Sequence, residues 1–161
     1  MILTELGRTD TLQRLTGERL VDAPRHEGFR TPLLSEAMLR HLYGWHRDIL
    51  LLAIGRRRVA EVTISREPPL EERTLNAAFA ALAEASGNPE HVAALINVSE
   101  RLEPYRRFER EFLDATEAET NDILAAIDSG DLRRLRTGLL RYHRRRQRIV
   151  PKLLETAQAP S

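Results

Sequence analysis

ALAEASGNPE (Ala81 to Glu90) and ILAAIDSGDL (Ile123 to Leu132) are the two stretches that decide the fold of this chain. Each contains the end of an amphipathic helix, a glycine that can take the left-handed conformation there, and a polar residue that can cap the next helix. The glycines are Gly87 and Gly130, and the capping residues are Asn88 and Asp131. Because so short a turn reverses the chain, each stretch predicts two antiparallel helices, and together they predict a helical bundle.

The composition is that of an ordinary globular protein. The chain has 161 residues, of which 42% are apolar and 30% charged, a balance that allows one domain to bury a core and solvate its surface. The absence of cysteine excludes a disulfide framework and a thiolate site, and it fits the cytoplasmic location that we expect. The longest apolar run, residues 49–54, is too short to span a bilayer, so we expect no membrane partner.

The spacing of apolar residues predicts helices along most of the chain after residue 34. The first begins at Ser35, and its inward stripe recurs at steps of three and four. Further helices are predicted over residues 70–86, from Pro89 through 96, from Pro104 to about 127, and from Leu132 onward. Pro151 should kink or end the last one, because its ring clashes with the carbonyl four residues earlier. Residues 59–69 could be an extended link or the frayed end of the first helix. The predicted fold class is all-α, an antiparallel helical bundle.

The N-terminal residues follow another pattern. Residues 11–20 suggest a short helix, and VDAPRHEGFRTP (Val21 to Pro32) alternates on both sides of a tight turn at Gly28. Such alternation is typical of a β-hairpin. We therefore predict three segments: a helix and hairpin over residues 1–32, an all-helical domain over 33–157, and a disordered tail over 158–161.

Charge is distributed unevenly, although the net charge is only +1. Residues 100–131 contain ten acidic and four basic side chains, whereas residues 132–155 contain nine basic and one acidic. The first interpretation is mutual compensation across the antiparallel pair that turns at Gly130. The alternative is a nucleic-acid surface on the last helix. Its arginines would be Arg144, Arg145, Arg146 and Arg148.

Three stretches carry a resemblance to a known family: GERLVDAPRHEGFRTPLLSEAMLRHLY, ALAEASGNP and ILAAIDSGDLRRLRTGLLRYH. In this order they resemble the GntR superfamily of bacterial transcription regulators, in the subgroup with a FadR-type C-terminal effector domain. The resemblance implies an all-helical module that binds a small-molecule effector, such as an organic acid, and forms a homodimer. Trp45, Tyr105 and Phe108 are candidates for its interface.

The same resemblance treats residues 1–32 as a truncated winged-helix remnant. The candidate DNA contacts in it are Arg8, Thr9, Arg25, His26 and Arg30. GRTDTLQRLTGERLV resembles a recognition helix, yet nothing before it corresponds to the helices that support one. Because a recognition helix needs such support to reach base edges, we do not expect specific DNA binding by this chain alone.

Many effector domains of this type hold a metal with one Asp and three His. The resemblance places these four positions at Leu75, Phe79, Thr120 and Tyr142, none of which is a metal ligand. His143 lies one residue away, a rotation of about 100° on a helix. We therefore expect no metal and no cofactor. The four residues could line an apolar effector pocket or simply fill the core.

His46 and Arg47 complete the set of candidate effector residues. A guanidinium group matches the geometry of a carboxylate, although Arg47 could instead pair with its neighbour Asp48. No phosphate-binding loop, nucleophile elbow or His-Glu metal motif occurs, so we do not expect an enzyme. The function predicted is an effector-binding and dimerisation module of a GntR-type regulator. The alternatives are a module that heterodimerises with a full-length regulator, and a basic helical protein that binds nucleic acid.

Overall fold

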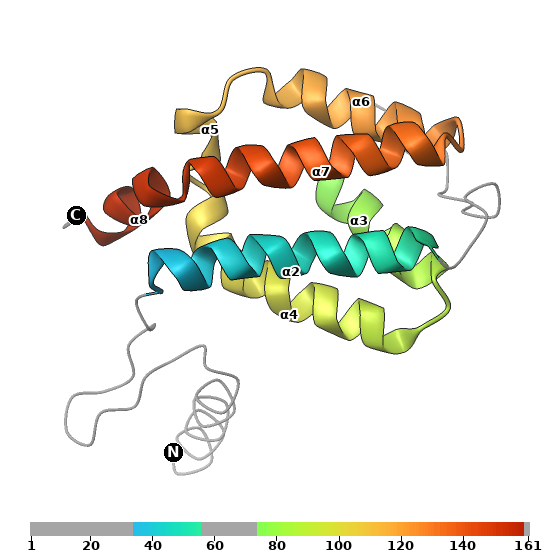
Figure 1. Ribbon diagram of the computed structural model, residues 1–161, viewed down its shortest axis with the longest axis horizontal. Coiled ribbons are helices and arrows are strands. Elements are labelled where there is room, and N and C mark those ends of the chain that lie inside the picture. The colour runs from blue at the N-terminus through green and yellow to red at the C-terminus, as the bar shows by residue number, and fades with distance from the viewer. Residues whose placement is uncertain (1–33, 56–73, 160–161) are drawn as a thin grey trace, which may run out of the picture. The chain divides into compact units, whose positions relative to one another are not determined.

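The computed structural model describes residues 34–55 and 74–159, and the chain divides into two compact units, Met1–Ser35 and Glu36–Ser161. In the second unit every described element is a helix, so the predicted all-α fold is confirmed (Figure 1). The helices are α2 (Glu36–Gly55), α3 (Leu75–Ala85), α4 (Pro89–Arg106), α5 (Glu109–Phe112), α6 (Thr116–Asp128), α7 (Leu132–Arg148) and α8 (Val150–Gln158).

Several predictions concern residues outside this description. They are the N-terminal helix and hairpin, the segment 59–69 and all five candidate DNA contacts, Arg8, Thr9, Arg25, His26 and Arg30. Among the residues described, no helix is both long and apolar enough to cross a membrane.

Both predicted turns have the expected backbone conformation. Gly87 has a φ of 70° and Gly130 a φ of 68°, the left-handed region that glycine adopts without strain. After Gly130 the N–H of Asp131 donates to the carbonyl of Ala126, which satisfies one of the free carbonyls at the end of α6. The Asp131 side chain then accepts from the N–H of Arg134 at 2.9 Å and caps α7. As predicted, α3 packs against α4 and α6 packs against α7.

The helix predicted from Pro104 to about residue 127 has the correct end, but its predicted start and its continuity are wrong. Helix α4 continues through Pro104 to Arg106, because its buried stripe spans the proline. That stripe consists of Leu95, Val98, Leu102 and Tyr105. The following helix is interrupted: α5 ends at Phe112, and Ala115 takes a left-handed φ of 49° directly before α6. Burial of one continuous face has overridden the local preference of proline to start a helix.

Helix α2 has the central place among the described helices. It packs against α3, α4, α7 and α8, and Figure 1 shows it between α7 and α4, with α6 on the far side of α7. The largest side chains of the core are almost fully buried. They are Leu39, Tyr43, Ile49, Leu50, Phe79, Leu82, Leu102, Ile123, Leu124, Leu135, Leu139 and Leu153.

Pro151 separates α7 from α8, as predicted. It stands in the first turn of α8 and has no N–H to donate to the carbonyl of Gln147, four residues earlier. Arg40 of α2 takes this role instead, because its Nη1 donates to the Gln147 carbonyl at 2.6 Å. In return, the side chain of Gln147 donates to the carbonyl of Arg40 at 3.2 Å. Two hydrogen bonds therefore join α2 to the end of α7, at the point where Pro151 separates α7 from α8.

Candidate functional site

An open pocket of about 680 Å³ lies among the start of α3, the junction of α4 with α5, and the facing sides of α6 and α7. Three of the predicted effector residues line it: Leu75, Thr120 and Tyr142. Hydroxyl and amide groups of Thr74, Asn76, Thr116 and Asn121 and the charged side chains of Arg106, Glu109, Arg110, Glu117 and Arg146 complete the lining. The volume falls in the range of small-molecule sites, and the lining is far more polar than predicted.

Phe79 lies in the core and does not line this pocket. It is 1% exposed, and its ring stands edge-on to Tyr142, with the ring centroids 5.5 Å apart. Phe79 and Tyr142, which the resemblance assigns to one site, therefore do meet inside the bundle. Phe79 also stands edge-on to His46 of α2, again at 5.5 Å. The sequence left two interpretations of Leu75, Phe79, Thr120 and Tyr142, a pocket lining or a core filling. Each describes part of the site, since Phe79 fills the core and the other three residues line the pocket.

His46 pairs with His143 deep in the bundle. Nδ1 of His46 lies 2.8 Å from Nε2 of His143, and Nδ1 of His143 lies 2.7 Å from the carbonyl oxygen of Leu139. A carbonyl only accepts, so Nδ1 of His143 carries a proton, and in the neutral ring Nε2 is an acceptor. His46 must then donate from Nδ1, which leaves its Nε2 as an unprotonated acceptor. That atom is buried and has no hydrogen-bond partner within the described ranges.

Burial keeps both rings neutral. Together with the smaller effect of the Arg106 charge, burial lowers the pKa of His46 to about 2. Burial likewise lowers the pKa of His143 to about 3, against a smaller opposing effect of the Leu139 carbonyl. The rotation of about 100° between neighbours on a helix explains the arrangement, because Tyr142 lines the pocket while the His143 ring contacts α2.

Arg47 lies outside the pocket and pairs with Asp48, which was the alternative to a role in effector binding. Its guanidinium group is 2.8 Å from the carboxylate of Asp48, and both side chains are partly exposed. Arg47 is not among the described residues that line the pocket with Leu75, Thr120 and Tyr142.

Arg146 is at the centre of a buried ion-pair network beside the pocket. It is 5% exposed, and it donates to Glu109 of α5 and to Glu119 of α6, both at 2.8 Å. Its guanidinium carbon lies 3.3 Å from the centroid of the Tyr142 ring. Because a buried charge is costly unless it is paired and hydrogen-bonded, these contacts permit the burial of three charged groups together.

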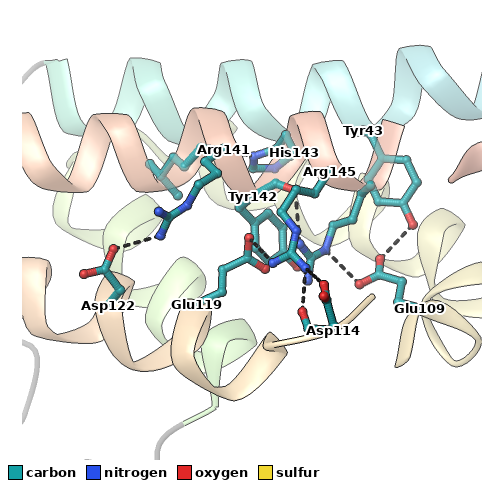
Figure 2. A network of polar contacts seen from close by, with 11 residues as sticks. Tyr43, Glu109, Asp114, Glu119, Asp122, Arg141, Tyr142, His143 and Arg145 are labelled. Carbon is teal, nitrogen blue, oxygen red and sulfur yellow. Dashed lines mark hydrogen bonds and ion pairs between the residues drawn. The ribbon is translucent and has the colours of Figure 1, made fainter. Parts of the chain in front are cut away.

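Tyr43 extends the network to α2. Its hydroxyl donates to the second oxygen of Glu109 at 2.7 Å, as Figure 2 shows. Burial and the adjacent carboxylate raise the pKa of Tyr43 far above its ordinary value, so the hydroxyl keeps its proton and remains a donor. Four helices, α2, α5, α6 and α7, thus meet at one set of polar contacts.

The remaining pairs between α6 and α7 lie closer to solvent. Asp122 contacts Arg134 at 2.6 Å and Arg141 at 3.0 Å, and hydrogen bonding from Arg134 lowers the pKa of Asp122. Arg145 lies 3.1 Å from Asp114 and 3.2 Å from Glu119 (Figure 2). Arginines of α7 are therefore paired with carboxylates of α6 and of the segment before it, as the first interpretation of the charge pattern predicted.

The sequence held a signal for Arg146 that the charge pattern concealed. Leu135, Leu139, Tyr142 and Arg146 recur at steps of four, three and four, so Arg146 continues the apolar stripe of α7. An arginine on a buried stripe needs acidic partners. Glu119 can be found in the same way, because it lies four residues before Ile123 on the buried face of α6.

No group of three or more His, Asp or Glu side chains that could hold a metal ion occurs among the residues described. Comparisons with protein-family models, with curated proteins and with solved structures gave no significant match to the chain.

Proposed function

We propose that the helical unit is the effector-binding and dimerisation module of a GntR-type transcription regulator. One observation carries the proposal: three of the four positions that the resemblance assigns to an effector site line a single pocket. Leu75, Thr120 and Tyr142 come from α3, α6 and α7 and are far apart in the sequence. The pocket is of a size that holds a small metabolite.

The contacts around the pocket offer a route from a ligand to the rest of the module. Tyr142 lines the pocket, and the next residue, His143, contacts His46 of α2. A ligand that favours one placement of α7 over another would therefore also act on α2. In a regulator, such a shift would change how two protomers, and the domains that they carry, are placed.

Helix α2 also offers a surface for a second copy of the chain. Met38, Trp45 and Leu52 are spaced seven residues apart and are 41%, 48% and 52% exposed, so they follow one outer face of the helix. Of the other interface candidates, Tyr105 is buried at 6% exposure, and only Trp45 belongs to this stripe. We propose that two α2 helices meet along it.

Sedimentation velocity of the full chain tests the dimer. The wild type should sediment as a dimer at micromolar concentration, whereas Trp45→Glu should sediment as a monomer because it places a charge in the centre of the contact. Leu132→Glu, on an exposed leucine of α7, is the matched control and should remain dimeric. A monomeric wild type, or a dimer unaffected by Trp45→Glu, would contradict the proposal.

The charge pairing described above gives less support to a nucleic-acid surface, since Arg145 and Arg146 already contact carboxylates.

The exposed stripe of Met38, Trp45 and Leu52 supports a second function, a module that pairs with a full-length regulator of similar sequence. Purification of the tagged chain from its native cells distinguishes the homodimer from this heterodimer. A heterodimer would bring down a longer protein with a winged helix, and Trp45→Glu should abolish that association.

A further inference from the structure

Half of the large apolar side chains that are exposed among the described residues lie on α2, in one line. They are Met38, Trp45 and Leu52, which are 41%, 48% and 52% exposed. Seven residues fall about 20° short of two helical turns, so the three side chains stay on one face over about 21 Å of the helix. Trp45 is the midpoint of the line, because Met38 and Leu52 each stand seven residues from it.

Asp48 lies beside this line and decides in which direction two such helices pack. It follows Trp45 by three residues and takes the second position of the seam between paired helices. Its side chain is 47% exposed, and Arg47 donates to one carboxylate oxygen, whereas the other oxygen has no contact within the described ranges. A charge with so few partners is favourable only where it keeps its water.

Parallel and antiparallel pairs place the two Asp48 side chains differently. In a parallel pair related by a two-fold axis, each seam residue faces its own copy, so the two carboxylates would meet and repel each other. In an antiparallel pair with the axis at Trp45, each Asp48 lies three residues beyond the axis, and the two carboxylates are about 9 Å apart along the helices. Antiparallel helices also set the positive N-terminal end of one against the negative C-terminal end of the other. Both effects favour the antiparallel pair.

We infer that two copies of this chain pack with their α2 helices antiparallel, around a two-fold axis at Trp45 that places Met38 of each copy against Leu52 of the partner subunit. The contact is self-complementary, as a two-fold interface requires, because positions 38 and 52 meet at both ends of the line. The flexible methionine side chain can adapt to the leucine that it faces. This arrangement rests on the proposed dimer and goes beyond it, because dimerisation alone fixes neither the direction of the helices nor the residues that meet.

Disulfide cross-linking of the full chain tests the arrangement, because the chain has no cysteine of its own. A disulfide forms only between residues whose Cα atoms lie within about 7 Å. Met38→Cys and Leu52→Cys alone should form no covalent dimer, since the two copies of each residue are about 21 Å apart along an antiparallel pair. The double variant should form covalent dimers, in which mass spectrometry finds position 38 linked to position 52. Leu140→Cys, on an exposed leucine of α7, is the matched control and should not cross-link.

Links from position 38 to 38 and from 52 to 52 would show a parallel pair and overturn the inference. The absence of every link in variants that sediment as dimers would overturn it too. Either result leaves the proposed dimer standing, since sedimentation of the wild type and of Trp45→Glu judges that dimer separately. A monomeric wild type would remove the dimer and the arrangement together.

Asp48→Asn gives a second measurement that needs no cysteine. In the antiparallel pair the two carboxylates lie apart, so the dissociation constant of the dimer should stay within about threefold of the wild-type value. In a parallel pair, the loss of two facing charges should tighten the dimer by about tenfold or more, and this result would contradict the antiparallel arrangement.

Discussion

At the scale of single residues, the neutral pair of His46 and His143 makes the stability of the fold depend on pH. Burial lowers the pKa of the two rings to about 2 and about 3, whereas in the unfolded chain they return to 6.5. Below that value the unfolded state binds protons that the folded state does not. The stabilisation is therefore complete above pH 6.5 and is lost as the pH falls toward the folded-state values.

We expect the free energy of unfolding, measured with urea, to fall by about 2–3 kcal/mol between pH 7.5 and pH 5.5, because each ring contributes about 1.4 kcal/mol over the one pH unit of this range that lies below its unfolded-state pKa. His46→Gln should show roughly half of this fall, since one titrating group has been removed. His41→Gln, on the exposed face of α2, serves as the control and should match the wild type. An equal slope in His46→Gln and the wild type would show that the pair does not titrate on unfolding.

Arg146 is the single residue whose loss should affect the fold most. Arg146→Met leaves the buried carboxylate of Glu109 without the arginine that pairs with it and leaves Glu119 with Arg145 alone, so we expect the free energy of unfolding to fall by about 3–5 kcal/mol in chemical denaturation. Arg144→Met, an exposed arginine of the same helix, should change stability by no more than about 0.5 kcal/mol. Equal effects of the two substitutions would mean that the buried ion pairs contribute nothing.

At the scale of helices and turns, left-handed residues mark where the chain changes direction. Ala115 adopts φ 49° and ψ 32° before α6, and its side chain is exposed, so glycine would relieve strain there without loss of packing. Ala115→Gly should stabilise the fold by about 1 kcal/mol, and the converse change Gly130→Ala should destabilise it by about the same amount. Thermal unfolding of the two variants tests this, and a shift of both in the same direction would contradict it.

The elements show which parts of the fold could be predicted and why. The turns at Gly87 and Gly130 could be predicted from the sequence, because glycine and the capping residues Asn88 and Asp131 act on their immediate neighbours. The course of the chain from Pro104 to Thr116 could not be predicted in this way. There the outcome depends on burial against other helices, which no local pattern contains, so the proline is accommodated inside α4 and the next helix is broken at Ala115.

At the scale of the whole molecule, the central place of α2 predicts cooperative unfolding. Because α2 packs against α3, α4, α7 and α8, its loss leaves none of these helices with a complete core. The fluorescence of Trp45 on α2 and the far-ultraviolet circular dichroism should therefore report the same urea transition. Leu50→Ala should shift both curves together by about 2–5 kcal/mol, since Leu50 is fully buried. Separate transitions for the two signals would contradict this view of α2.

The pocket shows how far prediction from the sequence reaches at this scale. The approach of Phe79 to Tyr142 agrees with the resemblance, which assigns both residues to one site. The polar character of the pocket lining was not predicted. Arg106, Glu109 and Arg146 come from three helices, and their meeting depends on the break between α4 and α6 that the apolar pattern does not reveal.

The contact of Arg40 with Gln147 has a consequence for how the protein is made. The two residues are 107 positions apart, so a ribosome that has just released α2 must synthesise all the intervening chain before α2 meets its partner. At ordinary rates of translation this takes about 5–20 s. Throughout that time the apolar side of a newly made α2 lacks its cover from α7, which makes the nascent chain a natural client for chaperones that hold exposed hydrophobic segments.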